Sequence, residues 1–143
     1  MSGIKLEQAR TIIAGALAKA TDTGLLPLSV VVLDAGGHTT AFERQDGASA
    51  MRFKIAHGKA YGAIAMGLGS RALYERAQKQ AYFIDAMNAL ADGALVPVPG
   101  GVLVRDANGE LLGAVGVTGD NSENDEMCAI AGIEAAGLVA DTG

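Results

Sequence analysis

Aromatic side chains and cysteine are scarce in this chain. Its 143 residues include three Tyr, three Phe and no Trp, so aromatic residues make up 4% of the sequence. The single cysteine, Cys128, has no partner for an internal disulfide. The N-terminal residues also lack a continuous apolar signal region. Together these features predict a protein of a reducing compartment, and we expect a cytoplasmic location.

Excess positive charge and long apolar runs are also missing. Eleven basic and sixteen acidic residues give a net charge of −5 at pH 7. The Lys and Arg residues are scattered singly, whereas a nucleic-acid-binding module normally displays a basic stripe. No apolar run reaches the roughly 18 residues of a transmembrane helix. We therefore expect neither nucleic acid nor a membrane as a partner.

Small apolar residues are abundant instead. Half of the chain is hydrophobic and 20 residues are glycine, which indicates a globular protein with close backbone contacts. Neither linkers nor repeats divide the sequence, so residues 1–143 are expected to form one domain.

Hydrophobic periodicity predicts the order of the elements. Apolar residues at helical spacing indicate helices, and β-branched runs next to glycine-containing turns indicate hairpins. We predict helices over 4–23, 49–66, 70–92 and 122–139, and strands over 29–34, 38–44, 102–105 and 110–119. Hairpins imply antiparallel pairing, so the predicted fold class is α+β.

The two histidines differ in their predicted roles. His38 lies at a hairpin turn, which is typical of a solvated residue. His57 lies inside a predicted helix with Tyr61 one turn later, so it could act as an acid–base group, as a ligand or as a structural residue. No spacing of His, Cys or carboxylates resembles a zinc site, and Cys128 is expected to be a small buried residue.

Two further segments contain candidate binding residues. Arg44 can hold a carboxylate through two hydrogen bonds, and Asp46 could accept a proton or orient Arg44; the alternative is a simple polar turn. The strand with Gly113, Gly116 and Gly119 indicates close approach either by a ligand or by a neighbouring helix.

Six segments, taken in order, match a known family: residues 31–38, 42–48, 59–61, 99–102, 113–119 and 125–129. They resemble the small haem-binding proteins of the GlcG/HbpS type, also found as the C-terminal domain of PduO-type corrinoid adenosyltransferases. This resemblance spans nearly the whole chain. It implies a profilin-like three-layer α/β/α sandwich with a central antiparallel sheet of about five strands, and assembly into homo-oligomers. The glycines in these segments suggest close backbone approach around one pocket or interface, where the candidate substrate-binding residues are Gly100, Gly101, Gly116 and Thr118.

Three functions remain open at this point. The first is binding of haem or a related tetrapyrrole, with His57 as axial ligand and Arg44 holding a propionate; the scarcity of aromatic residues counts modestly against it. The second is an enzyme of aromatic or small-acid catabolism that hydrolyses, deaminates or isomerises a carboxylated metabolite. Arg44 and Tyr61 would then bind the substrate, while His57 with Asp46 or Glu126 would move protons. The third is a noncatalytic sensor or assembly module.

Overall fold

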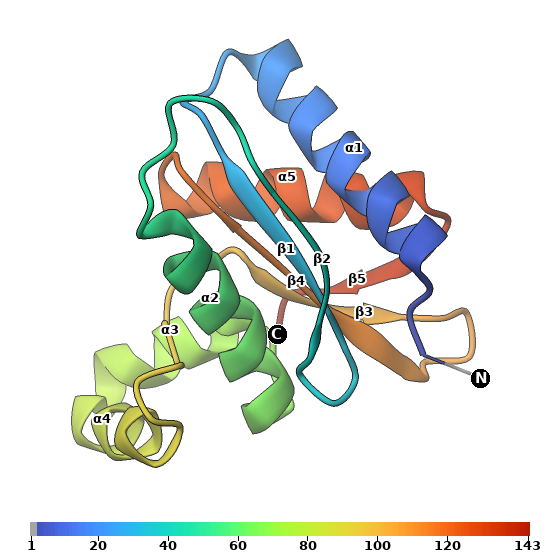
Figure 1. The fold of residues 1–143 in the computed structure, drawn as a ribbon. Helices are drawn as coiled ribbons and strands as arrows, with labels where there is room; N and C mark the ends of the chain where they lie inside the picture. Colours follow the sequence, from blue (N-terminus) through green and yellow to red (C-terminus); the bar gives the residue numbers. More distant parts are fainter. Residues whose placement is uncertain (1–2) are drawn as a thin grey trace.

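The β-branched run that follows Pro27 forms an inner strand of an antiparallel sheet (Figure 1). The structure is a computed structural model and describes residues 3–143. Strand β1 (Ser29–Asp34) pairs with β2 (Thr39–Arg44) on one side and with β4 (Leu111–Thr118) on the other. Strand β3 (Gly101–Arg105) pairs with β4 and with β5 (Val139–Asp141), so the strand order is β2-β1-β4-β3-β5.

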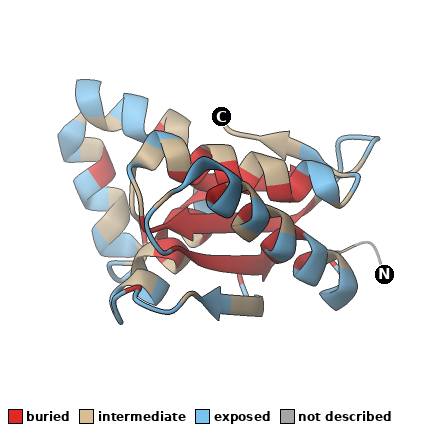
Figure 2. Cartoon of the chain, turned by 90° about the horizontal axis from the view of Figure 1, so that it is seen from above, coloured by how far each residue is buried: buried red, intermediate tan, exposed pale blue. Residues whose placement is uncertain are grey.

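Helices cover both faces of this sheet. Helices α1 (Leu6–Thr23) and α5 (Ser122–Ala135) pack on one face, and α2 (Arg52–Met66) packs on the other. Helices α3 (Ser70–Lys79) and α4 (Ala81–Leu90) extend beyond α2. Figure 2 shows the inner strands of the sheet buried between helices whose outward faces are exposed, whereas the edge strands β2 and β5 contain only exposed and partly exposed residues. The expected α+β, three-layer α/β/α sandwich with a five-stranded antiparallel sheet is confirmed.

Alternate residues of the central strands supply the two main cores, as the period of two in a strand requires. Val30 and Val32 face α1 and α5, whereas Val31 and Leu33 face α2. Because β1 is buried on both faces, its sequence is a continuous apolar run rather than an alternating one.

Two glycines that face each other across β3 and β4 let α2 approach the sheet closely. Gly101 and Gly116 are cross-strand partners. A Cβ atom on Gly116 would lie 2.0 Å from the carbonyl oxygen of Ala56, and one on Gly101 would lie 2.2 Å from that of Lys59. The α2 backbone therefore rests directly on this glycine pair.

Two element predictions were wrong. The predicted helix 70–92 is two helices, because Gln80 leaves the helical conformation at φ −142° and ψ 63° and the chain changes direction there. The predicted helix 122–139 ends at Ala135, since Gly137 takes φ +74° and the next residues pair with β3 as β5. Within residues 3–143, no helix has the length and apolar character needed to cross a membrane.

Candidate functional site

An aromatic stripe runs along the side of α2 that faces the edge strand β2. It consists of Phe42, Phe53, His57 and Tyr61. The Phe42 and Phe53 rings meet edge to face with centroids 4.7 Å apart. The imidazole of His57 lies 5.8 Å from the Phe53 ring and is stacked on the Tyr61 ring at 5.6 Å. Phe53, His57 and Tyr61 are four residues apart, so the helix itself aligns them on one face.

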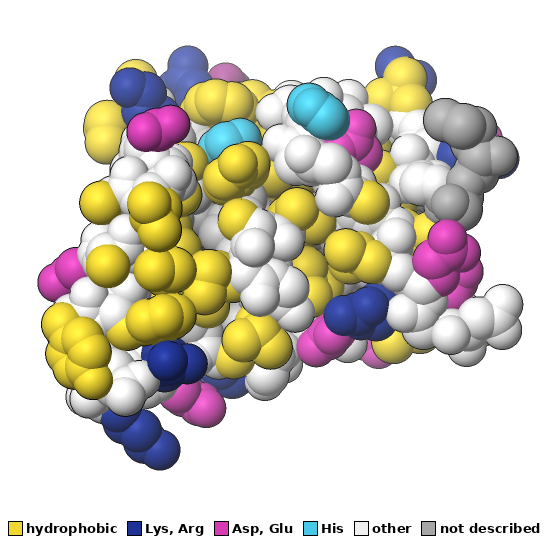
Figure 3. All heavy atoms as spheres, turned by 90° about the horizontal axis from the view of Figure 1, so that it is seen from below, with side chains coloured by type: hydrophobic (Ala, Val, Ile, Leu, Met, Phe, Trp, Pro, Cys, Tyr) yellow, Lys and Arg dark blue, Asp and Glu magenta, His cyan; other side chains and the backbone are white. Residues whose placement is uncertain are grey.

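His57 lies in the middle of this stripe and is half-buried. Burial lowers the pKa of His57 below its ordinary value, because the surrounding rings disfavour the charged imidazolium. The neutral imidazole is the form that binds a metal or accepts a proton. Figure 3 shows both histidines on one face of the molecule with hydrophobic side chains near them. His38, by contrast, has an exposed side chain whose Nδ1 lies 3.2 Å from Asp34 Oδ1.

The β1–β2 turn adjoins the far end of the stripe. Gly37 has φ +85°, and a Cβ atom there would lie 3.0 Å from the Tyr61 ring. Only glycine combines this backbone conformation with such a close approach to the ring. The turn therefore helps to hold Tyr61 beside His57.

Arg44 and Asp46 lie outside the aromatic stripe. Both line an open cavity of about 500 Å³, together with Leu25, Pro27 and Gln45. The Nη1 of Arg44 donates a hydrogen bond of 2.6 Å to the carbonyl of Ala48. Arg44 follows Phe42 by two residues on β2, so it shares the sheet face of the aromatic stripe but lies farther along the strand.

Glu126 is held by an arginine of another helix. The Arg71 Nε lies 3.1 Å from both carboxylate oxygens of Glu126, and Arg71 Nη2 donates to Oε1 at 2.9 Å. This two-point ion pair ties α5 to α3. Within residues 3–143, the structure therefore does not bring His57, Asp46 and Glu126 together as one proton-transfer group.

The remaining predicted residues surround the buried side of α2. Thr118 accepts a hydrogen bond of 2.9 Å from Arg52 Nη1. Gly100 crosses above Lys59, where a Cβ atom would lie 2.8 Å from Nζ. Within residues 3–143, only Gly116 of the three strand glycines that predicted a close approach contacts a helix; a Cβ atom on Gly113 would lie 2.1 Å from the carbonyl oxygen of Leu33, and one on Gly119 would lie 2.2 Å from that of Pro27.

Sequence reasoning missed a buried ion pair at this end of the sheet. The Nζ of Lys59 donates to Asp125 Oδ2 at 3.1 Å and to the carbonyl of Val117 at 2.9 Å. The side chains of Lys59 and Asp125 are only 2% and 1% exposed. Burial lowers the pKa of Lys59 and raises the pKa of Asp125, and the attraction between the two charges opposes both shifts. The sequence signal that could have pointed to this ion pair is that Lys59 and Asp125 both lie in segments that carry the family resemblance.

Within the described part of the chain, neither the Cys128 thiol nor a cluster of metal-binding side chains adds a reactive group to the site. Burial raises the pKa of Cys128 to about 11, so its thiol stays protonated and unreactive at neutral pH. Among residues 3–143 there is no group of three or more His, Cys, Asp or Glu side chains that could hold a metal ion.

The sheet with its two helical layers defines an α/β/α domain that recurs in solved structures. A PduOC–haem complex matches with a TM-score of 0.86 and 24% identity, covering 97% of this chain and 99% of the other. The Klebsiella pneumoniae protein ORFY matches with a TM-score of 0.85 and 24% identity, covering 96% and 92%. A double-mutant form of Streptomyces reticuli HbpS has a TM-score of 0.78 and 27% identity, covering 94% and 87%.

Sequence similarity identifies the family. Residues 4–134 match the family described as "Haem degrading protein HbpS-like", and the chain therefore belongs to the HbpS-like family. It is also 30% identical over 126 residues to a 15.0 kDa protein of the dhaT–dhaS intergenic region of Citrobacter freundii, covering 88% of this chain and 87% of that protein. The expected resemblance to the GlcG/HbpS type is confirmed.

Proposed function

We propose that this protein binds haem or a related iron tetrapyrrole, with His57 as the axial ligand. Membership of the HbpS-like family and similarity to a PduOC–haem complex support a haem- or small-ligand-binding role in general. The observation that carries the assignment to His57 is its half-buried imidazole, which is stacked on the Tyr61 ring and lies at a tilt to the Phe53 ring.

The residues present fit such a group. An imidazole whose pKa is lowered by burial is neutral at pH 7 and can donate its lone pair to iron. The rings of Phe42, Phe53 and Tyr61 offer an apolar surface to a flat macrocycle beside the imidazole. When bound, haem would supply an iron centre able to exchange electrons or small ligands.

Arg44 is the candidate for holding a carboxylate of the ligand. It lies on the sheet face of the stripe, and only one of its N–H donors is used on the Ala48 carbonyl. A guanidinium has five donors, so it can hold a propionate as well.

The alternative function, an enzyme that uses acid–base chemistry on a carboxylated metabolite, is less well supported. That alternative needs a carboxylate close to His57, but Glu126 is bound by Arg71 and Asp46 lines the cavity beside Arg44. The aromatic neighbours of His57 favour a ligand-binding imidazole over a proton relay.

Titration of the protein with hemin, followed by its Soret band, tests the proposal. We expect a shifted Soret band for the wild type and at least about tenfold weaker binding for His57→Ala, because the axial ligand is lost. His38→Ala is the matched control, since it removes an exposed histidine from the same face. Wild-type and His57→Ala proteins with the same Soret shift and affinity would contradict the assignment, provided that circular dichroism shows both folded.

A further inference from the structure

The first turn of α2 carries cations at the end of a helix that is already positive. It contains Arg52 and Lys54 and no acidic residue. Its N-cap residue, Met51, makes no side-chain hydrogen bond to the helix within residues 3–143. Because unpaired N–H groups and the helix dipole make an N-terminus positive, cations placed there are repelled. An anion bound at this turn would relieve that repulsion.

Beneath this turn, three polar side chains form a row across the sheet. Ser29 of β1 pairs with Arg44 of β2 on one side and with Thr118 of β4 on the other. Ser29 is two residues from Val31, which faces α2, so the row lies on the α2 face of the sheet. The Nη1 of Arg52 donates to Thr118 Oγ1 at 2.9 Å, which places the first turn of α2 over the row. We call these four residues, Arg44, Ser29, Thr118 and Arg52, the Ser29 row.

The hydroxyl at the centre of the Ser29 row has no partner. Ser29 is 0% exposed, and its Oγ atom forms no hydrogen bond within residues 3–143. Buried hydroxyls in folded proteins are nearly always hydrogen-bonded, because an unpaired one has lost its water without compensation. The cross-strand neighbours of Ser29 are a cation and a second hydroxyl. A negatively charged oxygen atom entering the row would therefore accept the O–H of Ser29.

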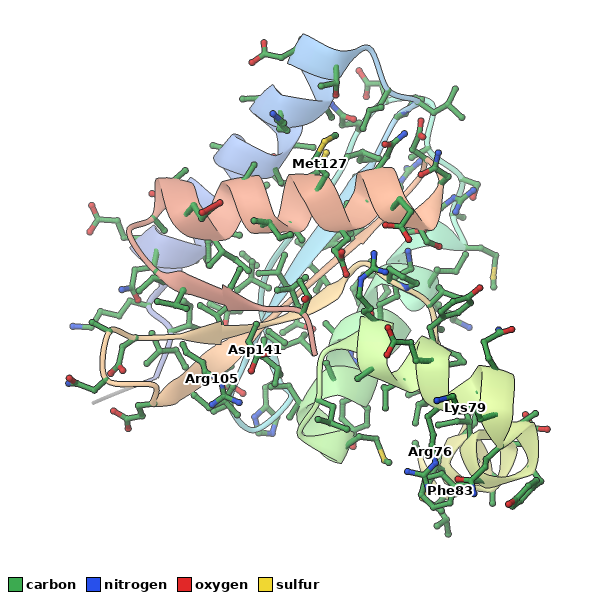
Figure 4. The ribbon with its side chains drawn as sticks, turned by 180° about the vertical axis from the view of Figure 1, so that it is seen from behind. Arg76, Lys79, Phe83, Arg105, Met127 and Asp141 are labelled. Atoms are coloured by element: carbon green, nitrogen blue, oxygen red, sulfur yellow. The ribbon has the colours of Figure 1, made fainter. Side chains whose placement is uncertain are left out.

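The two guanidinium groups of the Ser29 row also have donors to spare. Neither Arg44 nor Arg52 forms an ion pair within residues 3–143, although Asp46 lines the same cavity as Arg44. Each gives one hydrogen bond to a neutral oxygen, so most of its five N–H donors stay free. Arg105, by contrast, binds Asp141 at 2.9 Å, and Figure 4 shows these two side chains together. Arg44 is exposed and Arg52 is half-exposed, so these long side chains can part to admit a ligand.

We propose that the Ser29 row binds the oxyanion of a small ligand, a carboxylate or a phosphate, between Arg44 and Arg52. The guanidinium groups would supply charge and paired N–H donors, and Ser29 would supply a neutral donor. Phe53 follows Arg52, and its ring meets that of Phe42, which lies two residues before Arg44, so the row adjoins the aromatic stripe. Two sources have this chemistry. One is a propionate of haem, an assignment that rests on the proposed function, and the other is a separate small acid or phosphate, which does not.

Titration of the full chain with inorganic phosphate, without haem and at constant ionic strength, tests the site by amide NMR. We expect saturable shifts of the amide signals of Ser29, Thr118 and Phe53 in the wild type. Arg52→Gln should weaken phosphate binding at least about tenfold, because one of the two charges on the oxyanion is lost. Arg10→Gln is the matched control and should bind like the wild type, since Arg10 is an exposed arginine of α1.

The unpaired hydroxyl gives a second variant that separates binding from folding. Ser29→Ala should weaken phosphate binding about three- to tenfold, because one donor to the anion is lost. It should not lower the urea midpoint of the free protein, since Ser29 Oγ makes no hydrogen bond within residues 3–143. The proposal would be overturned by phosphate shifts that do not saturate, by unchanged affinity in Arg52→Gln, or by equal weakening in Arg10→Gln, with circular dichroism showing all variants folded.

Competition with hemin distinguishes the two sources of the oxyanion. If a haem propionate occupies the Ser29 row, phosphate should weaken hemin binding. Hemin dimethyl ester, whose carboxylates are blocked, should then bind equally to the wild type and to Arg52→Gln. If a separate molecule occupies the row, phosphate and hemin should bind without competing. Because the phosphate titration uses no haem, its failure would leave the Soret test of His57 standing, and a failed Soret test would leave the oxyanion site standing.

Discussion

At the scale of single residues, Lys59 carries its positive charge into the interior and is matched there by Asp125. Removing one partner of a buried ion pair leaves an uncompensated charge, which typically costs about 3–5 kcal/mol. We therefore expect Lys59→Met to lower the free energy of unfolding by that amount in urea denaturation. Lys54→Met, an exposed lysine of the same helix, should change it by less than about 0.5 kcal/mol.

A double substitution distinguishes the effect of the buried charges on stability from the effect of side-chain packing. Lys59→Met combined with Asp125→Leu removes both charges, and we expect it to regain most of the lost stability. If the double variant were no more stable than Lys59→Met alone, the loss would come from packing, and the ion-pair explanation would be wrong.

His57 makes the stability of the protein depend on pH. Its pKa is lower in the folded protein than the ordinary value of 6.5, so the unfolded chain binds a proton more readily. The contribution of His57 to the free energy of unfolding is complete above about pH 6.5. It is lost as the pH falls toward the pKa of His57 in the folded protein. Urea midpoints measured from pH 7.5 down to pH 5.5 should therefore fall more steeply for the wild type than for His57→Gln. Equal slopes would show that His57 titrates normally.

At the scale of elements, the Gly101–Gly116 pair determines how closely α2 approaches the sheet. In Gly116→Ala the new Cβ atom would collide with the Ala56 carbonyl, and α2 would have to move outward. We expect a loss of about 1–3 kcal/mol or more in the free energy of unfolding. Gly3→Ala is the control, since apart from its chain neighbours no atom of residues 3–143 lies within 4 Å of its Cβ position. Equal stability of the two variants would refute the close-packing role.

Because α2 carries His57, the same substitution bears on the proposed function. An outward shift of the helix would change the relation of Phe53 to Phe42 on β2. We expect Gly116→Ala to weaken hemin binding, even though Gly116 contacts Ala56 and Ala60 rather than the residues of the stripe.

At the scale of the whole molecule, the two main cores share one sheet and are expected to unfold together. The third core, built around Leu73, Ile84 and Leu95, joins α3 and α4 to the rest and is much smaller. Regions with few buried apolar contacts open at low free energy. Native-state hydrogen exchange should show α4 amides opening well before those of β1 and β4. A common opening free energy for all of these elements would contradict this division.

Most of the elements could be predicted because their signals are local. The β-branched run of β1, the Asn-Gly turn before β4 and the apolar period of α1 each lie within a few neighbouring residues. The break at Gln80 has no glycine or proline beside it to reveal it. Strand β5 has only three residues, too few to show a period of two.

The α+β class and the family could be predicted from the sequence alone. So could the position of His57 and Tyr61 on one helix face, because helical spacing aligns them. The tertiary structure decided which residues meet across long separations. It placed Phe42 against the α2 stripe, tied Glu126 to Arg71, and joined Lys59 to Asp125, which lies 66 residues away. Helix and strand preferences extend over only a few residues, whereas these contacts depend on how α2 packs on a glycine-lined sheet.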